Sequence, residues 1–207
     1  MQLKLHVSTL LLVIVSCGVN AHTQQDVPGG WVLTRPNQEV RIVPLPAAVA
    51  DSKNDSDVMV ADVAIAVMDP DVCCGRKSAL EDQAALAAGT SLKQLGEKLR
   101  GKHYLDSGET IVVTDNYWSG ASANAESIVA SLVAQHPLLM DWDGHLYVVY
   151  GALFDEYAYS SGGVSDVIKK LLLVDSRYAG KRRYVSFDRQ TDDWGKVAGI
   201  LALTITR

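Results

Sequence analysis

The sequence predicts an α+β fold, in which helices from the first part of the domain pack on an antiparallel sheet formed by its last part. Between residues 74 and 136, leucines and alanines recur every three or four positions, which is the spacing of amphipathic helices. After Pro137, β-branched and aromatic runs are separated by Gly, Asp and Ser, as in strands joined by turns. Helices followed by strands are typical of an α+β domain.

Three helices are expected, each with a glycine or proline near its end. Ser91 is the expected N-cap of the second helix and Ser122 that of the third. The expected helices span residues 74–89, 91–101 and 122–136. Cys74 therefore opens the first of them.

The expected strands follow the β-branched and aromatic runs. They cover residues 38–43, 110–114, 137–142, 145–154, 168–175, 182–189 and 197–205. The first is interpreted as an edge strand. Residues 57–69 are rich in Val and Ala, and periodicity leaves helix and strand both open, with extended chain favoured.

The chain is interpreted as three consecutive parts. Residues 1–21 have one early lysine, an apolar run and small residues, the layout of a secretory signal peptide. Two processing routes remain open: cleavage after Ala21, or lipidation of Cys17 in a segment that resembles a bacterial lipobox. Residues 22–57 are expected to be an extended or partly disordered lead-in, and residues 58–207 the α+β domain. The expected location is outside the cytoplasm of a bacterium: periplasmic, envelope-bound or secreted.

The charge balance argues against a nucleic-acid partner. The 207 residues carry a formal net charge of −5, whereas nucleic-acid binding needs clustered Lys and Arg. No cofactor or metal is expected, and contact with a membrane is expected only through the N-terminal lipid anchor. The sequence gives no indication of the oligomeric state.

Cysteine, histidine and aspartate occur in an order that suits thiol chemistry. Cys74 opens a helix, where the macrodipole favours the thiolate. His145 opens a strand after the turn "DWDG", and Asp175 ends the next strand. A thiolate nucleophile needs a base and a group that orients the base, so these three residues are the candidate catalytic triad.

The segments "CCGRKSAL", "HPLLMDWDGHLYVVYGA" and "KLLLVDSRY" resemble the papain-like cysteine peptidases that process bacteriocin leaders, and their stand-alone relatives. The likeness covers residues 69–188. It implies a papain-like fold, with the Cys-bearing helix among N-terminal helices that pack on a C-terminal antiparallel sheet. It further implies hydrolysis of a peptide or protein substrate, with Cys74 as nucleophile, His145 as base and Asp175 as its orienting partner.

Several alternatives remain open at this point. Cys73 is the alternative nucleophile, because successive helical residues point about 100° apart. Zinc binding and a Cys73–Cys74 disulfide are rival uses of the pair, although adjacent cysteines chelate and bridge poorly. Relatives carry a glutamine shortly before the nucleophile and "DP" at the aspartate, whereas this chain has no such glutamine and "DS". These departures favour the alternative function, an inactive papain-like domain that binds peptides or serves as an envelope scaffold.

Overall fold

The computed structural model describes residues 22–42, 91–104, 108–120, 124–175, 181–187 and 194–206. These residues are 66% strand and 17% helix, and they form a mostly antiparallel β structure with two α-helices. The expected papain-like α+β fold, with N-terminal helices packed on a C-terminal sheet, is therefore wrong. The sheet begins before the helices, because two strands lie in the segment expected to be a lead-in. The expected helix 74–89 and segment 57–69 lie outside the described residues.

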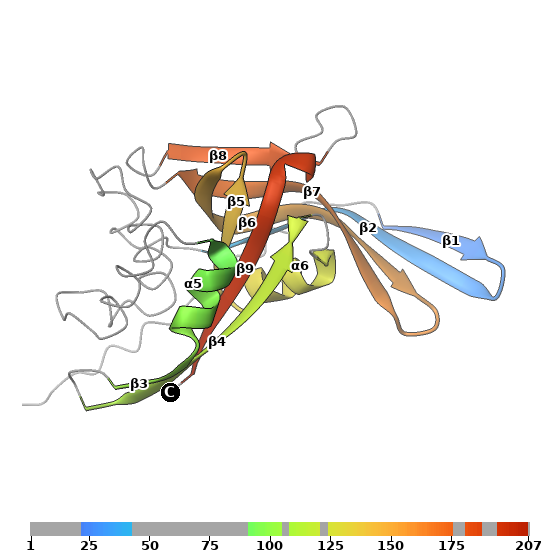
Figure 1. Ribbon diagram of the computed structural model, residues 1–207. Helices are drawn as coiled ribbons and strands as arrows, with labels where there is room; N and C mark the ends of the chain where they lie inside the picture. Colours follow the sequence, from blue (N-terminus) through green and yellow to red (C-terminus); the bar gives the residue numbers. More distant parts are fainter. Residues whose placement is uncertain are drawn as a thin grey trace, which may run out of the picture.

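In the described part of the chain, nine strands form one sheet, in the order β1-β2-β6-β5-β9-β4-β3, with β7 pairing β6 and β8 pairing β7 (Figure 1). Every pairing is antiparallel. The strands are β1 (Thr23–Val27), β2 (Gly30–Arg41), β3 (Gly101–Tyr104), β4 (Thr110–Ser119), β5 (Leu138–Trp142), β6 (His145–Tyr159), β7 (Val164–Asp175), β8 (Lys181–Ser186) and β9 (Val197–Thr206).

The strands expected after Pro137 are all present, and β4 is longer than expected. Strand β2 was expected only as a short edge strand over residues 38–43; it is 12 residues long and lies between β1 and β6. The prolines and glycines in and beside β2 lie at positions where they do not interrupt the strand pairing. Pro28 and Gly29 (φ 92°) form the β1–β2 turn, and Pro36 lies at a bulge between Arg35 and Gln38.

Strand β6 pairs with three other strands. Its first residues pair with β5, the rest of its length pairs with β2, and β7 runs along its other edge. Its central residues from Tyr147 to Ala152 are buried. The last strand, β9, lies between β4 and β5 and is buried over most of its length. Long-range pairing of this kind buries one continuous apolar core.

Two short helices cover parts of the sheet. Helix α5 (Leu92–Leu99) packs on β4 and β9, and Ser91 caps it with a complete capping box, as expected. Helix α6 (Ala125–Val133) packs on β7, β2 and β6. Its N-cap is Asn124 and not the expected Ser122, because the Asn124 carboxamide oxygen accepts from two backbone N–H groups of the first turn. A 3₁₀ turn, η3 (Trp194–Lys196), leads into β9.

The β1–β2 and β6–β7 hairpins project from the rest of the sheet (Figure 1). We call residues 23–35 and 155–168 the hairpin arm. The two turns are joined by backbone and side-chain hydrogen bonds: the Trp31 N–H donates to Ser160 Oγ (3.1 Å), and the Ser160 N–H donates to the Trp31 carbonyl (3.0 Å). The arm is therefore one composite element and not two independent hairpins.

Candidate functional site

His145 is held at the start of β6 by a tight turn. Asp143 (φ 53°) and Gly144 (φ 74°) both have left-handed backbone, which is the requirement of a two-residue type I′ hairpin turn. His145 pairs with Trp142 across this turn, and the Asp143 N–H donates to the Lys196 carbonyl (3.0 Å). The prediction that His145 opens a strand after "DWDG" is confirmed. Its side chain is exposed.

The residues beside His145 are rigidly packed. Tyr147 is only 2% exposed, and its ring lies 5.6 Å from that of Trp142, tilted by 54°. Such tilted aromatic pairs contribute about 0.5–1.5 kcal/mol beyond their burial. The backbone that carries His145 is thus fixed from both sides of the turn.

Asp175 is the last residue of β7, as predicted. Strands β6 and β7 are antiparallel, with Val148 opposite Val174 and Val149 opposite Leu173. The start of β6 and the end of β7 therefore lie at the same end of the strand pair. Continuing the register by one residue sets Asp175 opposite Tyr147, two positions along β6 from His145.

The structure does not describe the nucleophile of the candidate triad. Cys73 and Cys74 lie outside the described residues, as does Cys17, so the choice between the two neighbouring thiols stays a prediction. The roles of His145 and Asp175 in a triad likewise stay predictions. For His145 and Asp175 the structure shows only their positions, at the start of β6 and at the end of β7.

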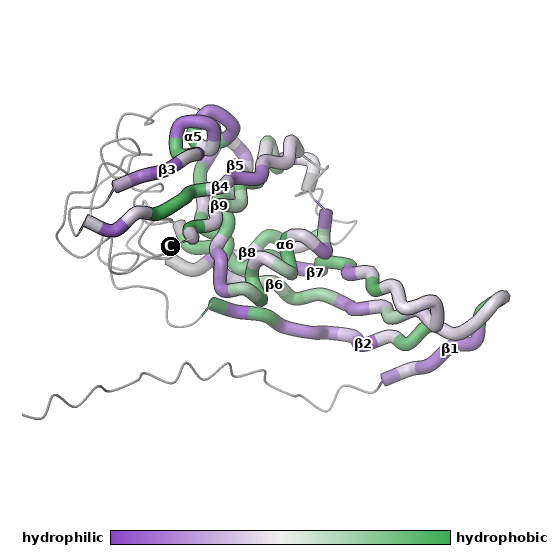
Figure 2. The backbone as a smooth tube through the Cα atoms, turned by 90° about the horizontal axis from the view of Figure 1, so that it is seen from below, coloured by the Kyte–Doolittle hydropathy of each residue, from purple (hydrophilic) through white to green (hydrophobic). Residues whose placement is uncertain are grey.

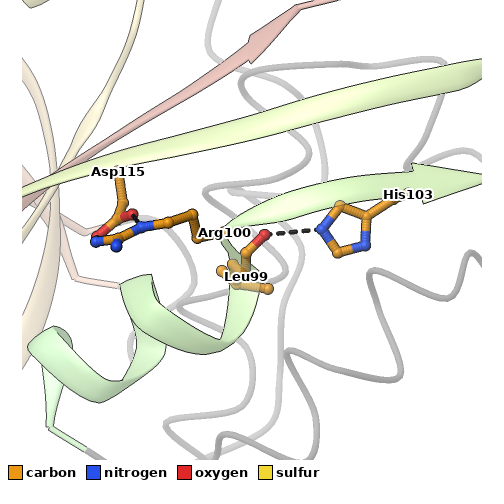
Figure 3. A network of polar contacts seen from close by, with 4 residues as sticks. All are labelled: Leu99, Arg100, His103 and Asp115. Carbon is orange, nitrogen blue, oxygen red and sulfur yellow. Dashed lines mark hydrogen bonds and ion pairs between the residues drawn. The ribbon is translucent and has the colours of Figure 1, made fainter.

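A second histidine has a structural role that the sequence did not indicate. His103 was expected in a loop, but it lies in β3 and is buried, with Nε2–H donating to the Leu99 carbonyl (2.8 Å; Figure 3). Leu99 is the last residue of α5, where backbone carbonyls lack partners within the helix. His103 thus caps the helix C-terminus. In the structure the segment "KHY" alternates between exposed and buried positions, with His103 at the buried one.

Arg100 and Asp115 form an ion pair beside this cap (Figure 3). The Arg100 side chain is 60% exposed, whereas that of Asp115 is only 3% exposed. Arg100 Nε contacts Asp115 Oδ1, and Nη2 lies 3.1 Å from Oδ2, so the contact is bidentate. The hydrogen bond to Asp115, and then its charge, raise the pKa of Arg100. The pair ties the end of α5 to β4.

Three carboxylates gather where α6 meets the hairpin arm. Glu156 and Asp166 are register partners on β6 and β7, and Glu126 of α6 accepts from the Asp166 N–H (3.4 Å). Arg35 pairs with Glu156 (2.5 Å). Burial, then the charges of Glu156 and Glu126, raise the pKa of the Asp166 carboxyl. Its Oδ1 is buried without a hydrogen-bond partner among the described residues.

Neither cluster suggests a metal. Within the described ranges, no group of three or more His, Cys, Asp and Glu side chains is arranged to hold a metal ion. The sequence did not indicate the carboxylate cluster, because its members come from α6, β6 and β7. These elements come together only through the pairing of β6 with β7 and the packing of α6 on them.

Comparison of the chain with protein-family models, with curated proteins and with solved structures finds no match. The likeness to papain-like peptidases thus rests on the short motifs alone. Among the helices of the described residues, none has the length and apolar character to cross a membrane.

Proposed function

We propose that the chain is an exported, cysteine-dependent hydrolase that attacks a peptide or amide carbonyl. Cys74 is the proposed nucleophile, with Cys73 as the alternative. His145 takes the thiol proton and later returns it to the leaving group, and Asp175 orients the imidazole. A peptide or protein is the proposed substrate, in the periplasm, at the cell envelope or in the medium.

One observation carries this proposal: His145 and Asp175 lie at the same end of two directly paired strands. A base and its orienting group must lie close together, and the pairing of β6 with β7 brings these two residues, 30 positions apart in sequence, to the same end of the strand pair. The proposal does not depend on a papain-like fold, because nucleophile, base and acid sets recur on unrelated folds.

Alkylation of the full-length reduced protein tests the proposal. Iodoacetamide labelling followed by digestion and mass spectrometry gives separate rates for Cys17, Cys73 and Cys74. We expect one of the adjacent cysteines to react faster at pH 7 than a free thiol, whose pKa is about 8.5. His145→Ala is expected to slow that cysteine at least about tenfold, as loss of an activating base does.

His22→Ala is the matched control, because His22 is also an exposed histidine at the beginning of a strand, one residue before β1. It should leave the labelling rate unchanged. If neither Cys73 nor Cys74 reacts faster than a free thiol, and His145→Ala changes nothing, the chain is not a thiol hydrolase.

The second candidate is a non-catalytic peptide-binding or envelope scaffold module. The nine-stranded sheet favours it, because the papain-like frame that the motifs imply is not the observed one. The absent upstream glutamine favours it too, since loss of one oxyanion donor costs about 10²–10³ in rate. Peptide binding that survives the Cys73→Ser/Cys74→Ser double substitution, without turnover by the unaltered protein, would support this candidate.

A further inference from the structure

The far end of the hairpin arm is uncharged and carries exposed apolar side chains. We call residues 27–34 and 157–165 the hairpin tip; their sequences, VPGGWVLT and YAYSSGGVS, contain no Asp, Glu, Lys or Arg. In Figure 2 this end of the arm is pale or green. Trp31 and Tyr159 are each 40% exposed, Val27 is 36% and Val164 is 55% exposed, and Val167 beside the tip is 50% exposed.

These side chains lie on both faces of the arm. Directly paired residues of an antiparallel sheet share a face, and successive residues alternate. Leu33 pairs with Ala158, which pairs with Val164, so Trp31, two residues before Leu33, shares a face with Val164. The opposite face carries Tyr159, which pairs with Val32, together with Val27 and Val167. The tip is therefore an apolar wedge.

A wedge of this shape suits a partner that surrounds it. A protein partner docks on one face, and a stable dimer buries about 1,200 Å² or more. Five partly exposed side chains divided between two faces offer only a few hundred Å², roughly the size of an ordinary surface patch. A second copy of the chain is thus a poor occupant.

A lipid bilayer surface fits these observations. Trp and Tyr concentrate at membrane interfaces, where the ring is in apolar surroundings and the polar edge stays hydrated. The tip has no charge to desolvate, and Asp26 and Asp166 lie directly behind it. The hydrogen bonds between Trp31 and Ser160 hold the two turns together, so the wedge enters as one unit.

We propose that the hairpin tip inserts into the interface of an electrically neutral, phosphatidylcholine-type bilayer, with Trp31 and Tyr159 as its anchors. This site is separate from the proposed catalytic end of β6 and β7, and it does not rest on the hydrolase proposal.

Quenching of tryptophan fluorescence by brominated lipid tests the insertion at one position. The full chain is mixed with phosphatidylcholine vesicles whose acyl chains are brominated, and with matched unbrominated vesicles. The chain has tryptophans at 31, 118, 142 and 194. We expect brominated vesicles to quench the unaltered protein and Trp31→Phe to lose most of that quenching. Trp118→Phe, a half-buried position in β4, is the matched control and should retain it.

A second variant covers the case in which Trp31→Phe perturbs the arm. Val164→Ser leaves every tryptophan in place and should lower the partition coefficient about three- to tenfold, as loss of a buried valine does. Raising NaCl from 0.05 to 0.5 M should change partitioning less than about twofold, because no charge pairing is involved.

Three results would overturn the proposal. The first is that brominated lipid leaves the fluorescence unchanged, or that it quenches Trp31→Phe as strongly as the unaltered protein. Equal quenching would show that the chain attaches to the bilayer through another segment. The second is that vesicle binding falls more than about tenfold at high salt, which would show that electrostatic attraction causes the binding. The third is self-association that Trp31→Phe weakens in the absence of lipid quenching, which would make the tip an interface between copies.

Discussion

Gly96 of α5 lies directly against Asp115 of β4: a methyl group on Gly96 would stand 2.7 Å from Asp115 Oδ2 and 2.8 Å from Leu201 Cδ1. Helix α5 thus approaches the sheet more closely than any side chain at this position permits. Arg100 binds both oxygens of this carboxylate, so Asp115 has little freedom to move away.

Gly96→Ala is accordingly expected to destabilise the protein. Alanine favours a helix over glycine by about 1 kcal/mol, but overpacking costs about 1–3 kcal/mol. The net expectation is a loss of up to about 2 kcal/mol, measured by urea denaturation. Lys93→Ala, on the exposed face of the same helix, is the control and should change stability by less than about 0.5 kcal/mol. Stabilisation by Gly96→Ala would mean that α5 can shift off the sheet at no cost.

His103→Leu tests the helix cap. The substitution keeps an apolar side chain at a buried position but leaves the Leu99 carbonyl without its donor. An unsatisfied buried backbone group costs about 1–3 kcal/mol, so a loss in that range is expected from urea denaturation. His103→Gln supplies an N–H donor again and should recover part of the loss. Equal losses in both variants would show that packing, and not the hydrogen bond, is what His103 contributes.

The strands after Pro137 were predictable because each is a contiguous run of β-branched or aromatic residues ended by turn residues. The Asp143-Gly144 turn placed the start of β6 at His145, and the position of Asp175 followed from the same reasoning. Helix α5 was predictable from its Ser91 cap and from leucines on one face. These features are local, so the sequence carries them within a few residues.

The wrong fold class has a physical cause in β1 and β2. Proline and glycine in residues 22–42 suggest a loop, yet here they occupy a turn and a bulge, and pairing with β6 more than a hundred residues away stabilises the segment. No local sequence pattern predicts a pairing between strands so far apart in the chain. The same limit applies to the carboxylate cluster, because Glu156 and Asp166 become partners only through the register of β6 and β7.

Asp166→Asn is expected to stabilise the protein at neutral pH. The pKa of Asp166 is raised in the folded state, so folding favours the protonated carboxyl and the ionised form opposes folding. That penalty is present above the folded-state pKa and declines as the pH falls through it. Because the site is partly exposed, the expected gain at pH 7 is a few tenths to about 1 kcal/mol.

Denaturation of Asp166→Asn and of the unaltered protein at pH 7 and at pH 3.5 measures this difference, which should shrink at the lower pH. Asp26→Asn, an exposed position on β1, is the control and should show no comparable gain. Glu126 and Glu156 face Asp166, and Arg35 binds Glu156, so neutralising Arg35 should enlarge the benefit of Asp166→Asn. A benefit that grows on acidification would contradict the assigned direction of the pKa shift.

Gly30 and Ser160 test whether the two turns of the hairpin arm act as one unit. A methyl group on Gly30 would stand 1.9 Å from Ser160 Oγ and 3.1 Å from its Cβ, so Gly30→Ala must displace the serine and break its bond to the Trp31 N–H. We expect a loss of about 1–3 kcal/mol for Gly30→Ala. Ser160→Ala alone loses one partly exposed hydrogen bond, about 0.5–1.5 kcal/mol.

The double variant Gly30→Ala/Ser160→Ala removes the contact with Ser160 Oγ and should lose less than the sum of the two single substitutions, with a coupling of at least about 0.5 kcal/mol. Urea denaturation gives the free energies, and hydrogen exchange at the Trp31 and Ser160 amides reports the arm directly. Strict additivity would show that the two hairpins move independently. In that case Trp31 and Tyr159 would lie on separate flexible turns, which would remove the rigid wedge on which the proposed insertion into lipid depends.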